Sequence, residues 1–267
     1  MRPGARAPAP RPARLAAAAA ALLLAGCATV PPDAGSNPRD PLERLNRHVY
    51  GFNDQFDRYV MKPVAKGYVA VVPHAFRLCI DNGFSNIGEI RNAVNDVLQA
   101  KPAGAATDTG RLAINSTLGV FGCFDVARRM GLEHRYEDFG LTLARWHVGP
   151  GPYLVLPLLG PSDVRDAVGL VPDSYTNPFS YVTPIHDRYL YLAGALIDTR
   201  AVLLDATNLI DQAALDRYQF TRDAWFQHRT SLQYEGNPPP PQLEEDDGGD
   251  APAPPAKPAQ PPPAPGR

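Results

Sequence analysis

Apolar side chains recur at helical spacing through residues 41–60. Placed about 100° apart around a helix, they form a stripe about 100° wide, with the charged residues elsewhere. Asp40 is expected to cap this helix, with Pro41 at its first position and Met61-Lys62-Pro63 at its end. The stripe faces either a protein core or a lipid interface, and the spacing leaves both open. Its members are Leu42, Leu45, Val49, Phe52, Phe56, Tyr59 and Val60.

Further helices are predicted in the middle of the chain. Residues 189–197 are apolar nearly all round, so this stretch lies in a core or touches lipid, and it is too short to span a bilayer. In the last helix Arg222 and Arg229 fall on the apolar side. They either meet buried carboxylates or extend to water, with phosphate contact as the alternative. The predicted ranges are 85–100, 104–120, 187–206 and 211–233.

Residues 139–186 are dense in Gly and Pro, and the run 149–161 (GPGPYLVLPLLGP) is apolar yet cannot form a regular helix. Polar backbone groups of such a run are tolerated at membrane depth only where protein or a water-filled cavity satisfies them. We therefore expect this run at an inner wall, with Phe52 and Asn53 near it, or else as a plug in the core.

The two ends of the chain differ from the middle. Residues 1–26 combine four Arg and no acid with an apolar run that ends at Gly26, which is typical of an export signal. Leu24-Ala25-Gly26-Cys27 resembles a bacterial lipobox, so Cys27 is the expected lipid anchor, followed by a polar tether to residue 40. Residues 236–267 are mostly Pro, Ala and acids, with one large apolar residue, and are expected to be a disordered tail.

Composition narrows the function further. The 267 residues include 30 Pro and 22 Gly, and the net charge of −2 gives no electrostatic reason to expect nucleic acid. Only Cys79 and Cys123 remain beside Cys27; in an oxidising compartment we expect them to be bridged, and two buried thiols are the alternative. No zinc, nucleophile-elbow or phosphate-loop motif occurs, and the six His are scattered, so no metal, cofactor or catalytic set is predicted.

The chain resembles the MlaA (VacJ) lipoprotein family over about residues 40–232. Asp40-Pro41-Leu42-Glu43 with Asn46-Arg47 and Phe52-Asn53 resembles the opening of that family. The most distinctive blocks are Glu137-Asp138-Phe139-Gly140 and the segment from Gly149 to Asp166. Other matching blocks lie at residues 82–99, 111–127, 198–205 and 218–227. The tail and the pair Cys79/Cys123 lie outside the pattern.

The resemblance implies a mainly α fold, a ring of amphipathic helices around a channel with Gly/Pro-rich connections. The domain would occupy residues 41–235 and lie at the periplasmic face of the outer membrane. It implies removal of misplaced glycerophospholipid from the outer leaflet, delivery to a periplasmic carrier of the MlaC type, and association with a trimeric porin. The expected phospholipid-contacting residues are Phe52, Asn53, Tyr153 and Leu156.

Two other functions remain open. The Pro-rich tail is compatible with a structural lipoprotein that tethers the outer membrane to the cell wall. A lipid hydrolase is the third class, although no nucleophile context supports it. Outer-leaflet phospholipid that accumulates in a deletion strain, without breakdown products, would distinguish transport from both.

The lipobox generates the first testable prediction. Changing Cys27 to Ser should leave the protein uncleaved or released from the outer-membrane fraction. Two or three acyl chains hold a protein firmly on a bilayer, and the variant would carry no acyl chain. Mass spectrometry of the wild-type protein should show a modified Cys27. An unmodified Cys27 in the wild type would contradict the anchor.

Overall fold

The computed structural model describes residues 30–31 and 33–239. The predicted signal, the anchor Cys27 and most of the predicted tail lie outside these residues. The described chain is mainly helical with one short β-hairpin, which confirms the predicted fold class. Its elements are α2 (Glu43–Phe56), η1 (Asp57–Met61), α3 (Lys62–Val71), α4 (His74–Leu98), α5 (Pro102–Thr117), α6 (Val126–Arg129), α7 (Phe139–Arg145), β1 (Tyr153–Leu156), β2 (Gly160–Asp163), α8 (Val164–Thr176), η2 (Pro178–Tyr181), α9 (Ile185–Val202), α10 (Leu204–Ala213) and α11 (Arg217–Gln233).

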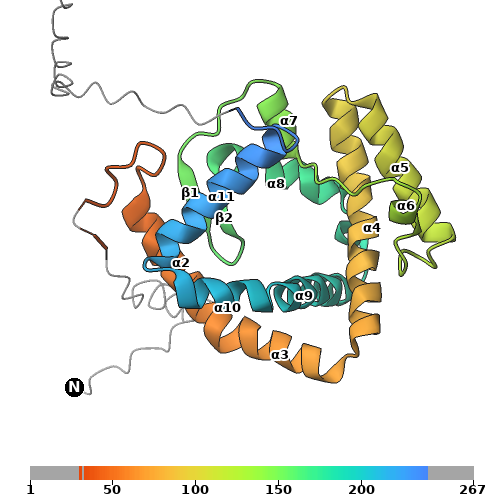
Figure 1. Ribbon diagram of the computed structural model, residues 1–267, viewed down its shortest axis with the longest axis horizontal. Coiled ribbons are helices and arrows are strands. Elements are labelled where there is room, and N and C mark those ends of the chain that lie inside the picture. The colour runs from red at the N-terminus through yellow and green to blue at the C-terminus, as the bar shows by residue number, and fades with distance from the viewer. Residues whose placement is uncertain (1–29, 32, 240–267) are drawn as a thin grey trace, which may run out of the picture.

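The contacts between these elements close a circuit, which Figure 1 shows as a closed path of ribbons. Helix α3 packs on α9, α9 on α4, and α4 on α8; α8 contacts the hairpin, and β1 contacts α2. Helix α5 lies against the outer side of α4, and α11 contacts α7 and β2. The hairpin is antiparallel, with Tyr153 opposite Asp163 and Leu156 opposite Gly160.

The first helix does not end at Met61-Lys62-Pro63 as predicted. Helix α2 passes into α3 through the π-helical turn η1, in which the Lys62 N–H donates to the Asp57 carbonyl, one residue further back than in an α-helix. Pro63 directly follows this turn, and a proline inside a continuous helix has no N–H to donate to the residue four before it. The π turn is therefore what allows the helix to continue past the proline.

Asp40 does not cap that helix, which corrects a second expectation. The N-cap of α2 is Leu42, which has no capping side chain, and Asp40 is completely buried instead. Its Oδ1 accepts a hydrogen bond from Asn46 at 2.8 Å, and its Oδ2 accepts one from Tyr218. The carboxylate that looked like a local cap therefore joins the two ends of the domain.

Three further boundaries differ from the prediction. Helix α4 begins at His74 rather than residue 85. Its exposed Phe76 and Ile80 stand 11 and 7 residues before Ile87, so the apolar stripe starts earlier than predicted. The predicted helix 211–233 is broken: Asp216 caps a new helix by accepting from the Tyr218 and Gln219 amides, and Leu215 is fully exposed. Residues 139–186, expected as connections, contain α7 and α8, and α8 includes Pro172.

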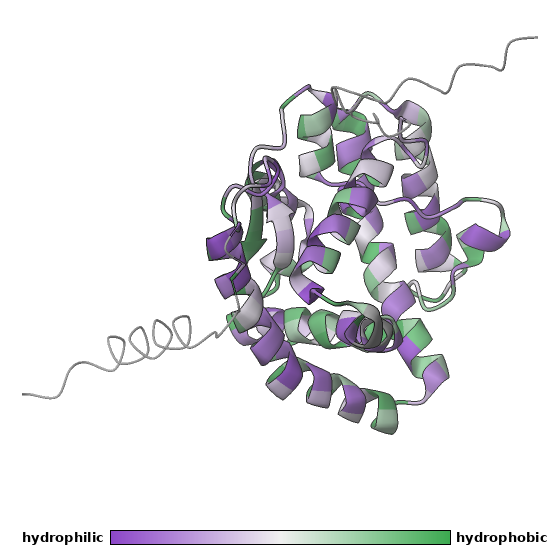
Figure 2. Ribbon diagram, turned by 60° about the vertical axis from the view of Figure 1, so that its left-hand side comes forward, coloured by the Kyte–Doolittle hydropathy of each residue, from purple (hydrophilic) through white to green (hydrophobic). Residues whose placement is uncertain are grey.

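Most helices carry both polar and apolar residues around their circumference (Figure 2). In α2, α4 and α5 the buried side is the polar one, whereas α3 packs on α9 and α10 through the apolar cluster of Ala65, Ala201 and Leu204. In α2 the buried residues are Glu43, Asn46 and Arg47, whereas Leu45 of the apolar stripe is 56% exposed. Across the described residues, 21 buried side chains are polar or charged and only eight are hydrophobic. The domain therefore inverts the usual distribution of a water-soluble protein.

Helix α9, which is not amphipathic, also leaves apolar side chains on the surface. Of its apolar stretch, Tyr189 is 59% exposed, Leu190 69% and Leu196 55%, so the stretch is not central in a core. None of the described helices is both long and apolar enough to cross a membrane. An apolar helix left on the surface and too short to span is suited to contact lipid laterally.

Cys79 of α4 and Cys123 of the loop before α6 form a disulfide in the structure. The loop it holds places Val120 and Phe121 in the left-handed region, and Phe121 is 88% exposed. The Asn82 side chain also binds the Cys123 carbonyl at 3.0 Å. The bridge therefore fixes an apolar loop against α4.

Removing the bridge should destabilise the domain. The two cysteines are 44 residues apart, for which chain entropy predicts a loss of about 4 kcal/mol at most in the double variant Cys79→Ser/Cys123→Ser. Denaturant unfolding with and without reductant measures this loss. Labelling of the unfolded, unreduced wild type should find neither thiol reactive, and two reactive thiols would contradict the bridge.

Candidate functional site

The Gly/Pro-rich segment is held by asparagines of α2. The Asn46 amide donates to the Tyr153 carbonyl at 2.9 Å and accepts from the Val155 N–H at 2.9 Å. A side-chain amide thus makes the pair of bonds that a neighbouring strand would make to β1. Because a hairpin edge would otherwise expose unpaired backbone groups, the contact completes β1 without a third strand.

Asn53 repeats the arrangement two turns further along α2. It donates to the Leu156 carbonyl at 2.9 Å and accepts from the Leu158 N–H at 2.8 Å. Seven residues separate it from Asn46, so both amides lie on one face of the helix. Asn53 therefore lies beside the segment 149–161, as expected. Its side-chain amide holds the hairpin turn through these two hydrogen bonds.

Asp40 lies beneath the first clamp. Besides Asn46, it accepts from the Tyr218 hydroxyl at 2.5 Å and from Arg222 at 3.3 Å. Burial, together with the bond to Asp40, raises the pKa of Tyr218, so the phenol remains a donor. Arg222 thus meets a buried carboxylate, one of the alternatives that the sequence left open.

The structure separates the four residues expected to contact phospholipid. Tyr153 is 1% exposed and packs among Tyr218, Trp225 and Phe226, with ring centroids 5.3–6.5 Å away. A side chain so enclosed positions the hairpin and offers no surface to a lipid. Phe52 and Leu156 are half-buried and remain accessible. The core alternative therefore describes Tyr153 but not the whole segment.

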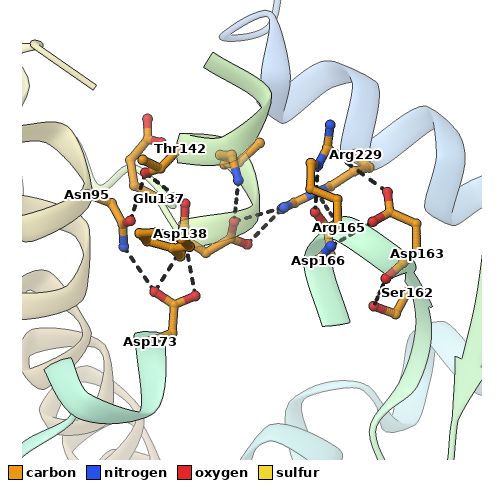
Figure 3. A network of polar contacts seen from close by, with 12 residues as sticks. Asn95, Glu137, Asp138, Thr142, Ser162, Asp163, Arg165, Asp166, Asp173 and Arg229 are labelled. Carbon is orange, nitrogen blue, oxygen red and sulfur yellow. Dashed lines mark hydrogen bonds and ion pairs between the residues drawn. The ribbon is translucent and has the colours of Figure 1, made fainter. Parts of the chain in front are cut away.

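A second polar network joins α11 to α7 and α8 (Figure 3). Both terminal nitrogens of Arg229 bind Asp138, at 2.7 and 2.8 Å, and its Nε lies 2.5 Å from Asp166. Burial alone would raise the pKa of Asp138, but the bonds from Arg229 outweigh it and hold that pKa below its usual value. Asp163 caps α8 through the Asp166 amide at 2.7 Å, and its burial raises its pKa to about 6.

Two glycines make this network possible. A methyl group on Gly140 would overlap the Asp166 carboxylate and the Arg229 guanidinium, and one on Gly169 would overlap the backbone of Gly140. Helices α7 and α8 therefore cross at glycine, where their backbones can approach closely. Arg229 binds the Asp138 carboxylate through two nitrogens. Like Arg222, it therefore meets a buried carboxylate and not a phosphate.

Two hollows were not anticipated from the sequence. One, of about 520 Å³, has a polar lining that includes Lys101, paired with Glu137 at 3.0 Å and Glu235 at 2.7 Å. The other, of about 450 Å³, lies between α4 and α9 and is largely apolar. Its lining residues are Phe84, Val182, Asp187, Leu190, Tyr191 and Gly194. Their spacing carries no motif, because the hollow forms only where the two helices meet.

Among the residues that the structure describes, no group of His, Cys, Asp or Glu side chains is arranged to hold a metal ion. The site consists of the asparagine clamps, the buried ion pairs and the accessible apolar side chains.

The model of the MlaA lipoprotein family matches residues 38–232. The chain belongs to the MlaA lipoprotein family. The intermembrane phospholipid transport system lipoprotein MlaA of Escherichia coli is 36% identical over 210 residues, covering 77% of this chain and 82% of that protein. Its namesake from Haemophilus influenzae is 30% identical over 229 residues, covering 84% and 90%.

A solved structure agrees with the sequence comparison. A chain from work on the structural basis for maintenance of bacterial outer membrane lipid asymmetry superimposes with a TM-score of 0.62 at 34% identity. The match covers 74% of this chain and 99% of the other. The family resemblance inferred from sequence blocks is thereby confirmed.

The asparagine clamp gives a test of how the site is held. Asn46→Ala leaves the Tyr153 carbonyl and the Val155 N–H without partners, and each buried unpaired group costs about 1–3 kcal/mol. Denaturant unfolding should therefore show a clear loss of stability. Asn237→Ala, an exposed Asn-to-Ala control, should change nothing. Equal stability of the two variants would contradict the clamp.

Proposed function

We propose that this protein removes glycerophospholipid from the outer leaflet of the outer membrane and passes it toward the periplasm, which maintains outer-membrane lipid asymmetry. One observation carries the proposal: the buried side chains are mostly polar, and large apolar side chains cover the surface. The relatives named for intermembrane phospholipid transport support the same activity.

The physical task is to shelter a charged headgroup. A charge at the centre of a bilayer costs at least a few kcal/mol, and more by some measures. A domain with apolar sides outward and polar sides inward can lie among acyl chains and offer polar groups within. A channel along the inner side of the circuit of helices would let the headgroup pass while the tails stay in apolar surroundings.

The same surface supports the proposed location. An acylated Cys27 would hold the domain at the periplasmic face of the outer membrane, and exposed apolar residues such as Tyr59 and Leu190 would enter the inner leaflet. A helix that is too short to span can still lie within one leaflet. The apolar surface is thus explained without a transmembrane segment.

The hairpin turn is the proposed point where headgroup and tail separate. Phe52 and Leu156 offer accessible apolar surface, while Asn53 and Tyr153 hold the turn in place from either side. The apolar hollow between α4 and α9 is of a suitable kind for an acyl chain. Phe179 stacks on Tyr191 at 4.5 Å beside it, which stiffens one wall.

No covalent chemistry is needed for this task, so the protein is proposed to act as a passive conduit and not as an enzyme. A passive conduit cannot set direction, so a periplasmic carrier of the MlaC type would have to accept the lipid. A trimeric porin is the proposed membrane partner. Both partners are proposed from the family resemblance.

Complementation of a deletion strain tests the proposal. Outer-leaflet phospholipid should accumulate in the deletion strain and fall on re-expression of the wild type, without lipid breakdown products. Leu156→Asp should fail to reverse it while still reaching the outer membrane, because a carboxylate would stand where tails pass. Leu156→Met is the matched control and should complement.

Tyr153→Asp provides the contrast. It buries a charge in the aromatic cluster and should prevent accumulation of folded protein. If Leu156→Asp also fails to accumulate, the turn is core and the proposed lipid contact there is wrong. If the deletion strain shows no excess phospholipid, the transport function itself is wrong.

A further inference from the structure

Two aspartates meet in the interior between α4 and α5. Asp96 of α4 and Asp108 of α5 are both 0% exposed, although neither caps a helix. A methyl group on Gly104 would overlap the Asp96 carboxylate and the Arg135 guanidinium, so the first turns of α5 approach closely here. Two carboxyl groups are therefore confined in one tightly packed place.

These two carboxyl groups share a single cation. Arg135 lies 2.6 Å from Asp96 Oδ2 and 3.8 Å from Asp108 Oδ1. Three of the four carboxyl oxygens, Asp96 Oδ1 and both of Asp108, have no hydrogen-bond partner among the described residues. Two ionised carboxylates so placed would leave one buried negative charge without compensation, which is strongly unfavourable.

Among the described residues, the guanidinium of Arg111 is already paired elsewhere. Arg111 of α5 binds Glu89 at 2.6 Å and Asp125 at 3.1 Å. His134 lies 3.0 Å from Glu89, whose pKa these two partners hold below its usual value against the effect of burial. Glu89 therefore stays ionised and adds a negative charge close to the pair.

We propose that Asp96 and Asp108 form a buried proton-binding site, in which one proton shared between the two carboxyl groups joins α5 to α4. The protonated carboxyl donates its O–H to the other carboxylate, which supplies the partner that the bare oxygens lack. Uptake takes a proton from water, and release returns it and leaves the pair with one more negative charge. Ions with several ligands are a poorer fit, since the described residues hold no metal-binding group.

The site makes the α4–α5 contact depend on pH. Burial, then the charge of Glu89 and contact with Asp96, raise the pKa of Asp108 to about 7, from an ordinary value near 3.8. The folded state then binds the proton more tightly than the unfolded state. The bound proton stabilises the folded state fully below about pH 4, and this stabilisation is lost as the pH rises through about 7.

The segment before α7 shares this dependence. Arg135 is bound to Asp96, and the Asn92 amide holds the Arg135 carbonyl at 2.7 Å. When the proton leaves, two carboxylates compete for Arg135, while Glu235 beyond α11 also acts on it. The residues 131–138 and the start of α5 should therefore loosen together.

Infrared spectroscopy of the full-length lipidated protein in detergent tests the proton directly. The difference spectrum of the wild type across about pH 5–8.5 should contain a protonated-carboxyl band that disappears with a midpoint near pH 7. The ester carbonyls of the anchor do not titrate and cancel in this difference, and Asp163 contributes a separate component with a midpoint near pH 6. Asp108→Asn should abolish the component with a midpoint near pH 7, and Asp205→Asn, at an exposed aspartate, should keep it.

Thermal melting supplies the second readout. The melting temperature of the wild type should fall between about pH 5.5 and 8.5, and that of Asp108→Asn should be flatter over the same range and higher than wild type at the alkaline end. The proposal is overturned if the wild type shows no carboxyl component with a midpoint near pH 7, or if that component survives in both Asp108→Asn and Asp96→Asn. Stabilisation of the wild type by millimolar Mg²⁺ or Ca²⁺ at alkaline pH that Asp108→Asn lacks also overturns it, because the occupant would then be a cation. If Asp108→Asn does not fold, the wild-type band and Asp96→Asn decide.

Discussion

Hydrogen bonds between buried side chains hold these helices together, and the rest of the structure depends on them. Asp40 joins α2 to α11, Arg229 joins α11 to α7 and α8, and Arg111 joins α5 to α4 through Glu89. Because the polar sides of the helices face inward to make these bonds, their apolar sides must face outward. The exposed apolar surface is a consequence of how the interior is built.

The helices were predictable because an amphipathic stripe has the same period whichever side is buried. For the same reason the pattern could not say which side faces inward. Leu45 and Asn46 are neighbours in sequence, yet the amide is buried and the leucine is exposed. Only the surrounding solvent distinguishes the two arrangements, and the lipobox and the family blocks were the signals for it.

What the sequence did not disclose depends on contacts made far along the chain. Asp40 has the spacing of a cap, and its partner Tyr218 lies 178 residues away. Pro63 predicts the end of the helix unless a π-helical turn precedes it, and no sequence pattern predicts such a turn. The position of Asn53 beside the Gly/Pro-rich segment could be predicted, because the helical face that Asn53 occupies is evident from the sequence. The burial of Tyr153 was not, since it required α11 to cover the hairpin.

The small apolar core has a thermal consequence. The heat-capacity change of unfolding grows with the apolar surface exposed and shrinks with the polar surface exposed. When a domain with largely polar buried side chains unfolds, it should expose little apolar surface and much polar surface, so its heat-capacity change should be small. Its curve of free energy against temperature should be shallow and broad, with little tendency to cold denaturation. Stability would then vary less with growth temperature than in a soluble domain of the same length.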